Sequence, residues 1–126
     1  MTPVELDHLV LYVEDIDATC AFYEKLGATT ETFAGGRQAI RIGEQKINLH
    51  KAGDEYDPHA RSPEPGAGDF CLIVDGSIDG TVKHLTDAGV EVIHGPVEKT
   101  GARGPMDSVY TSDPDGNLVE LAVYRD

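Results

Sequence analysis

The sequence predicts an α+β fold in which two βαβββ modules form a cup-shaped mixed sheet within a single domain of 126 residues. Three observations predict it. Each half of the chain holds one helix pattern among several short strand patterns. The order strand, helix and three strands occurs twice. A stretch with three prolines and no periodicity, residues 52–67, separates the two occurrences and is expected to be a linker.

Module one covers residues 1–51. Its first strand is expected within 4–13, where apolar and β-branched residues dominate. A helix follows, because Asp15 can cap it and apolar residues then recur at helical spacing until Gly27. Glycines mark the turns between the three remaining strands, which we expect at 28–34, 37–42 and 45–51.

Module two covers residues 68–126 and repeats this order. A strand over 68–74 precedes a helix that ends at Gly89. The stretch 96–105 is rich in Gly and Pro and is expected to be a loop. The other strands are expected at 90–95, 108–112 and 117–124. Neither module alone could bury a large core, so we expect the modules to pack together or with those of a second chain.

The composition argues against several partners. Because 23 acidic residues face 10 basic ones, the net charge of −13 repels a phosphate backbone, and nucleic acid is not expected to bind. No apolar run is long enough to span a membrane, and the first residues do not resemble a signal peptide. A cytoplasmic location is therefore expected. The acidity fits either simple solubility or life at high salt.

Potential metal ligands lie opposite the apolar faces of the outer strands. Glu120 interrupts an apolar strand, and a lone carboxylate there is costly to desolvate without a partner. By strand alternation His8, His50 and Asp69 occupy similar positions. Overlaying the modules matches Asp69 with His8, and Glu120 with His50. If the two sheets form a cup, these four residues can converge on a divalent ion: Fe, Mn, Ni, Co or Zn.

Each of these residues also has an ordinary interpretation. His8 could be a hydrogen-bonded strand histidine, and His50 could be exposed at a strand end. Asp69 follows a glycine and could cap a loop, and Glu120 could pair with an arginine. What favours the metal site is the placement of all four at comparable positions of a repeat.

Several polar side chains are expected on the same face as these ligands and are our candidates for binding the substrate. Arginines there would suit an anion that carries a carboxylate or a phosphate-like group. Alternatively, the arginines could lie on an exposed edge strand. The candidates are Arg37, Arg41, Asn48, Ser108 and Tyr110.

Residues 6–28 and 108–124 resemble the two ends of the vicinal oxygen chelate superfamily, which includes glyoxalase I, extradiol dioxygenases, and fosfomycin and bleomycin resistance proteins. The resemblance covers the whole chain. The segments 45–74 and 95–121 are most similar to a branch of small glyoxalase-domain-containing and virulence-associated proteins.

This resemblance implies paired βαβββ units around a divalent metal that chelates neighbouring oxygens of a substrate. By position it implies His8, His50 and Glu120 as ligands, with Asp69 where related enzymes carry His. That Asp departs from the glyoxalase and fosfomycin patterns. The histidine that precedes the dioxygenase motif is also missing, since Gly101 and Arg103 occupy that region.

The leading expectation is a metal-dependent lyase or isomerase that acts on a small oxygenated anion. Glu120 and Asp69 are the expected catalytic residues, because a carboxylate beside a metal can move a proton if its pKa is suitable. An extradiol-type Fe(II) dioxygenase and a non-enzymatic binding or resistance protein are the alternatives. A homodimer is expected, and the sequence leaves open whether one chain supplies all the ligands.

Overall fold

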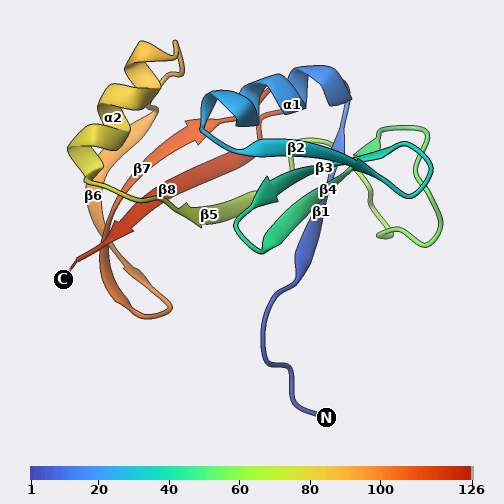
Figure 1. Ribbon diagram of the computed structural model, residues 1–126, viewed down its shortest axis with the longest axis horizontal. Helices are drawn as coiled ribbons and strands as arrows, with labels where there is room; N and C mark the ends of the chain where they lie inside the picture. The colour runs from blue at the N-terminus through green and yellow to red at the C-terminus, as the bar shows by residue number, and fades with distance from the viewer. Residues whose placement is uncertain (126) are drawn as a thin grey trace. The chain divides into compact units, whose positions relative to one another are not determined.

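The computed structural model describes residues 1–125, and the chain divides into two compact units, Met1–Gly66 and Ala67–Asp126. Each unit contains one four-stranded mixed sheet and one helix (Figure 1). The predicted α+β class and the two βαβββ modules are therefore confirmed. Among residues 1–125, no helix is long and apolar enough to cross a membrane.

The first unit has its strands in the order β1-β4-β3-β2, with β1 parallel to β4 and the other pairs antiparallel. Its helix starts where predicted, because the Asp15 side chain accepts a hydrogen bond from the Ala18 N–H at 3.0 Å. Tyr23 of that helix is fully buried in the core of this unit. The elements are β1 (His8–Val13), α1 (Ile16–Lys25), β2 (Thr29–Phe33), β3 (Arg37–Ile42) and β4 (Gln45–Lys51).

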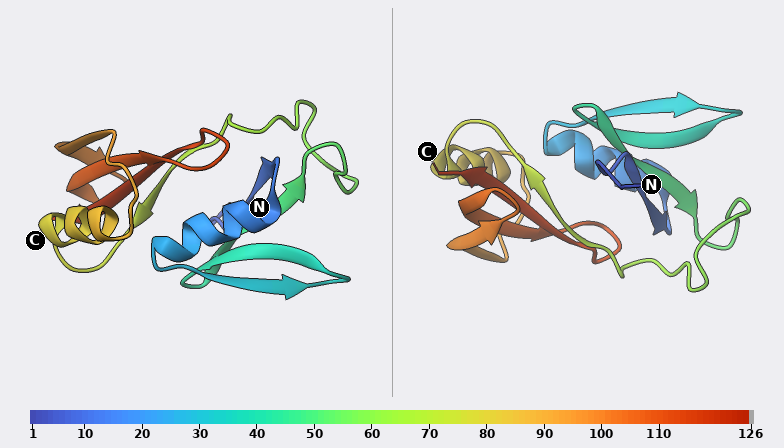
Figure 2. Two further views of the ribbon diagram at one scale, coloured as in Figure 1. Left: turned by 90° about the horizontal axis from the view of Figure 1, so that it is seen from above. Right: turned by 90° about the horizontal axis from the view of Figure 1, so that it is seen from below.

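The second unit repeats this topology in the order β5-β8-β7-β6, with β5 parallel to β8 (Figure 2). Ser77 caps its helix by accepting a hydrogen bond from the Gly80 N–H at 3.0 Å. Leu85 of the helix and Val109 and Val119 of the sheet form its buried core. The elements are β5 (Asp69–Ile73), α2 (Ile78–Asp87), β6 (His94–Gly101), β7 (Gly104–Ser112) and β8 (Leu118–Tyr124).

The prediction of a loop at 96–105 is wrong, because most of this stretch forms the β6–β7 hairpin. A register shift between His94 and Val97 accommodates Pro96, since a bulge needs no ladder hydrogen bond from that position. Gly95 has a φ of 96°, and a Cβ there would lie 2.6 Å from the Ser108 carbonyl oxygen. Only glycine fits this bulge, so the Gly and Pro that predicted a loop are instead requirements of a bent strand.

The two sheets each have a face away from their own helix, which we call the helix-free face. On the first sheet the strand registers align three rows of side chains across this face. The rows are His8–Lys46–Arg41, Val10–Asn48–Ala39 and Tyr12–His50–Arg37. On the second sheet Cys71, Glu120 and Tyr110 form one such row. The registers put Arg37, Arg41, Asn48, Ser108 and Tyr110 on these faces.

The registers correct the overlay of the two modules. His8 is paired with Lys46, and Asp69 is paired with Leu118. Asn48 lies two positions after Lys46 on β4, and Glu120 lies two positions after Leu118 on β8. Asn48 is therefore the counterpart of Glu120, and the match of Glu120 with His50 is wrong by two residues.

Candidate metal and substrate site

Glu120 is half-buried in the middle of the second sheet. Its Oε2 accepts a hydrogen bond from the buried Ser108 hydroxyl at 2.7 Å. Among residues 1–125, no Lys, Arg or His forms an ion pair with it. The interpretation of Glu120 as the partner of an arginine therefore has no support, and a half-buried carboxylate lacks a counter-charge.

The neighbours of Glu120 carry raised pKa values. Burial, followed by the Glu120 charge, raises the pKa of the Cys71 thiol to about 11. Cys71 is thus a neutral thiol at ordinary pH and a weak nucleophile. Burial and the same carboxylate also raise the pKa of Tyr110. Both side chains stay protonated beside Glu120, so the negative charge of this row is concentrated on the Glu120 carboxylate.

Asp69 lies on the same face as Glu120. It is on the adjacent strand β5, two positions before Cys71, which is the register partner of Glu120. The Asp69 side chain is exposed. The second unit therefore has two carboxylates on one face, and solvent reaches the Asp69 carboxylate more readily than that of Glu120. Among residues 1–125, no three His, Cys, Asp or Glu side chains are close enough together to form a metal-binding group.

His8 is oriented by a carboxylate in the first unit. Its Nδ1 lies 2.8 Å from Asp7 Oδ2, and this hydrogen bond lowers the pKa of Asp7. In the neutral tautomer that donates Nδ1–H to Asp7, Nε2 has a free lone pair. Metal-binding histidines generally donate their second ring N–H to a carboxylate or carbonyl in this way. The contact of His8 with Asp7 therefore fits a ligand role, and it involves a residue that the sequence analysis did not single out.

His50 is placed differently. The register pairs it with Tyr12 and pairs His8 with Lys46, so the two histidines are four positions apart on neighbouring strands. That corresponds to roughly 13 Å along the strands. The His50 Nδ1 also accepts a hydrogen bond from the Tyr56 N–H at 3.2 Å. The structure thus brings His50 to the loop after β4 and not to His8.

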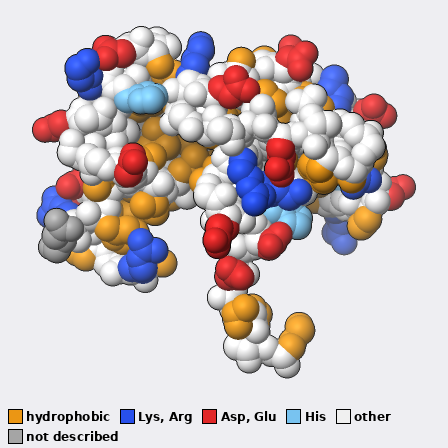
Figure 3. Space-filling view, in the orientation of Figure 1, with side chains coloured by type: hydrophobic (Ala, Val, Ile, Leu, Met, Phe, Trp, Pro, Cys, Tyr) orange, Lys and Arg blue, Asp and Glu red, His pale blue; other side chains and the backbone are white. Residues whose placement is uncertain are grey.

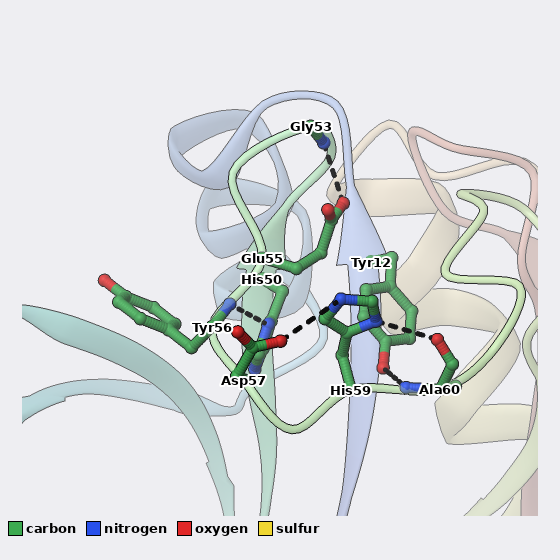
Figure 4. A network of polar contacts seen from close by, with 8 residues as sticks. All are labelled: Tyr12, His50, Gly53, Glu55, Tyr56, Asp57, His59 and Ala60. Atoms are coloured by element: carbon green, nitrogen blue, oxygen red, sulfur yellow. Dashed lines mark hydrogen bonds and ion pairs between the residues drawn. The ribbon is translucent and has the colours of Figure 1, made fainter.

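That loop is fixed to the sheet by a small polar network (Figure 4). The Tyr12 hydroxyl accepts a hydrogen bond from the Ala60 N–H at 2.9 Å. The His50 ring makes edge contacts with Tyr12 and Tyr56, with centroids 5.5 and 5.4 Å apart respectively. The Arg37 guanidinium lies 4.2 Å from the centre of the Tyr56 ring. Tyr56 thereby connects the loop to both His50 and Arg37.

The remaining polar side chains of the first sheet differ in their partners. Arg41 forms an ion pair with Glu31 at 3.7 Å. The Lys46 ammonium, which the sequence analysis did not single out, lies 3.6 Å from the centre of the Phe33 ring. Asn48 Oδ1 is buried and accepts no hydrogen bond from any residue in 1–125. A buried acceptor without a donor is costly, so Asn48 has capacity to receive a hydrogen bond from a ligand.

Lowering the pH is expected to release the loop from His50. Burial and the nearby Arg37 charge lower the pKa of His50, because both disfavour the imidazolium. The contact with the Tyr56 N–H needs a neutral Nδ1, so it is complete above the ordinary histidine pKa of about 6.5. It is lost as the pH falls through the lower pKa of folded His50. Backbone ¹⁵N relaxation at Tyr56 and Ala60 should report the increased motion.

Two variants separate His50 from the other histidine of this loop. His59 is the second histidine near this network, and its ring contacts the Ala60 carbonyl and Asp57. In His50→Gln the pH dependence should disappear, because an amide does not titrate. In His59→Gln it should persist. An unchanged response in His50→Gln would show that the loop is controlled from elsewhere.

The chain is thus a paired-module protein, with two βαβββ units of the same topology that each carry polar side chains on a helix-free face. A family model described as the Glyoxalase/Bleomycin resistance protein/Dioxygenase superfamily matches residues 5–121. The chain belongs to this superfamily.

Two curated relatives support the assignment. The glyoxalase domain-containing protein RDO1 of Mycosarcoma maydis is 48% identical over 121 residues, which is 96% of this chain and 69% of the relative. The virulence protein STM3117 of Salmonella typhimurium is 47% identical over 120 residues, covering 94% of this chain and 83% of that protein. The predicted resemblance to glyoxalase-domain-containing and virulence-associated proteins is therefore confirmed.

Solved structures agree with the fold. The crystal structure of STM3117 has a TM-score of 0.96 at 45% identity and covers 99% of this chain and 100% of its own. A lactoylglutathione lyase from Agrobacterium tumefaciens has a TM-score of 0.73 at 26% identity, covering 97% and 95% of the two chains.

Proposed function

We propose that this protein is a divalent-metal-dependent enzyme of lyase or isomerase type that acts on a small oxygenated anion. The observation that carries the proposal is Glu120, a half-buried carboxylate without a basic partner among residues 1–125. A bound cation would supply the missing counter-charge. The similarity to a lactoylglutathione lyase favours lyase chemistry over oxygen insertion.

The chemical types of the donor groups suit such an ion. The proposed ligands are His8, Asp69 and Glu120, which offer one imidazole nitrogen and two carboxylates. This combination suits Fe(II), Mn, Ni, Co or Zn. His50 was a fourth candidate, but its hydrogen bond to the loop and its distance along the strand from His8 leave it out of the proposed set. His8 belongs to the first unit and Asp69 and Glu120 to the second, and we also propose that the protein is a homodimer.

A bound ion would act as a Lewis acid on neighbouring oxygens of the substrate. The protein's own residues would bind the substrate and move its proton. Asp69 is exposed and is the proposed proton acceptor, while Ser108 holds the Glu120 carboxylate in one orientation. Arg37, Arg41 and Asn48 are the proposed contacts to the anion, and a small-molecule substrate in the cytoplasm fits the acidic, membrane-free composition.

Metal titration of the EDTA-treated protein tests this proposal. We expect Co(II) to bind near one equivalent per site with the visible absorption of nitrogen and oxygen coordination, and His8→Ala to abolish it. His84→Ala is the matched control, since His84 is exposed on α2. If none of the five candidate metals binds the wild type, the proposal fails and the non-enzymatic binding alternative takes its place. Oxygen uptake with a catechol and Fe(II) would instead establish the dioxygenase alternative.

A further inference from the structure

Two basic side chains of the first unit differ from all the others. The chain has 10 Lys and Arg residues, and all lie within the described residues 1–125. Every one is exposed except Arg37 and Lys46, which are half-buried. Both project from the helix-free face of the first sheet, in rows four positions apart, and the Lys46 side chain extends to the ring of Phe33, which is the register partner of Arg37. A protein that is acidic overall therefore keeps its two least exposed cations on one face of a sheet. Figure 3 shows a group of basic side chains on one face of the molecule, with acidic side chains beside it.

Neither cation forms an ion pair with a carboxylate of the described residues, although the pKa of Asp7 is lowered by His8 and, to a smaller extent, by the charge of Lys46. Within residues 1–125 no ion pair involves Arg37 or Lys46. Each is instead held over an aromatic ring, Arg37 over Tyr56 at 4.2 Å and Lys46 over Phe33 at 3.6 Å. A ring face attracts a cation, but it offers no lone pair to the remaining N–H donors. The two side chains are thus fixed in position with unused hydrogen-bonding capacity.

Arg41, on the same face, provides the contrast. It is exposed, and Glu31 lies 3.7 Å from its guanidinium. Its charge is therefore already balanced by a protein carboxylate. The sequence alone ranked Arg37 and Arg41 equally, whereas the structure separates them by burial and by partner.

We propose that Arg37 and Lys46 form an anion-binding subsite that takes the carboxylate or phosphate group of the ligand. That the bound ligand is a substrate rests on the proposed function. The binding of the anion itself requires no metal. Guanidinium and ammonium donors form strong, short hydrogen bonds with such oxygens. The overall charge of −13 opposes unspecific anion binding, so an anion held by this protein must meet a local positive site.

Isothermal titration of EDTA-treated protein with inorganic phosphate at low ionic strength tests the subsite. We expect Lys46→Gln and Arg37→Gln each to weaken phosphate binding about tenfold or more, the usual loss for a hydrogen bond to a charged group. Lys51→Gln is the matched control, because Lys51 is exposed at the end of the same strand and alternates to the opposite face. Lys51→Gln should stay within about twofold of the wild type.

Further measurements keep the outcomes distinct. Arg37→Lys retains the charge and should restore part of the affinity, which a variant that merely unfolds would not do. Displacement of phosphate by malonate at lower concentration would identify the ligand group as a carboxylate, and failure to displace it would identify a phosphate. Phosphate that binds all variants equally, or does not bind the wild type, overturns the subsite. Because metal is absent throughout, Co(II) titration of the same variants tests the proposed function separately.

Discussion

Glu120→Gln is expected to weaken divalent-metal binding by about a hundredfold or more while leaving the fold intact. Losing a residue that only orients a ligand costs about 10- to 100-fold in metal affinity, and a charged ligand should cost at least as much. The amide keeps an oxygen that can accept the Ser108 hydroxyl, now 2.7 Å from Glu120 Oε2. The substitution therefore removes the charge and preserves the local hydrogen bond. Competition between the protein and a coloured chelator for Co(II) measures the change.

Glu91→Gln is the control for this variant. Glu91 belongs to the same unit and is exposed, so its substitution removes one carboxylate without touching the helix-free face. Its metal affinity should match that of the wild type. Equal affinity in Glu120→Gln and the wild type would contradict the assignment of Glu120 as a ligand and leave its burial without a functional reason.

Asp113→Ala is expected to lower the free energy of unfolding by about 3 kcal/mol. Asp113 is only 5% exposed. Its Oδ1 accepts the N–H groups of Asp115 and Asn117 at 3.0 Å, and its Oδ2 accepts the Asn117 side-chain amide at 2.8 Å. Alanine would leave these donors without a partner in a site that water does not reach. Urea denaturation followed by circular dichroism measures the loss.

The destabilisation caused by Asp113→Ala should extend beyond the turn. The oriented Asn117 amide also accepts the Gly68 N–H at 2.7 Å, which joins the turn before β8 to the residue before β5. Asp113→Asn should destabilise less than alanine, because its oxygen can still accept backbone N–H groups. Asp75→Ala, at an exposed turn, should change stability by less than about 0.5 kcal/mol. A loss of similar size in Asp75→Ala and Asp113→Ala would show that the buried network is not the cause.

Local signals in the sequence were sufficient for most elements. Asp15 caps its helix through a hydrogen bond that depends only on nearby residues, and strand alternation placed Arg37 and Tyr110 on the correct faces. The hairpin around 96–105 was missed, because the Gly and Pro signals of a loop and of a bulged strand are the same. Only the pairing of β6 with β7 distinguishes them.

The candidate site was harder to predict, since it depends on contacts between distant residues. The role of His50 is decided by a loop that folds back to meet Tyr12, a contact between residues 48 positions apart. The correspondence of Asn48 with Glu120 depends on strand register. A register shifted by two residues keeps every side chain on the same face, so alternation alone does not distinguish the two registers. Lys46 gave no signal, because its half-buried place over Phe33 comes from packing across the sheet.

The matched positions of Asn48 and Glu120 describe how an internal duplication has diverged. One copy carries a neutral amide there, amid basic side chains that include Arg37 and Lys46. The other copy carries a carboxylate, with Asp69 on the same face. The two copies thus differ in charge at one structurally equivalent position, while each helix-free face carries side chains of both signs: Arg41 and Glu31 on the first, Lys99 and Glu120 on the second.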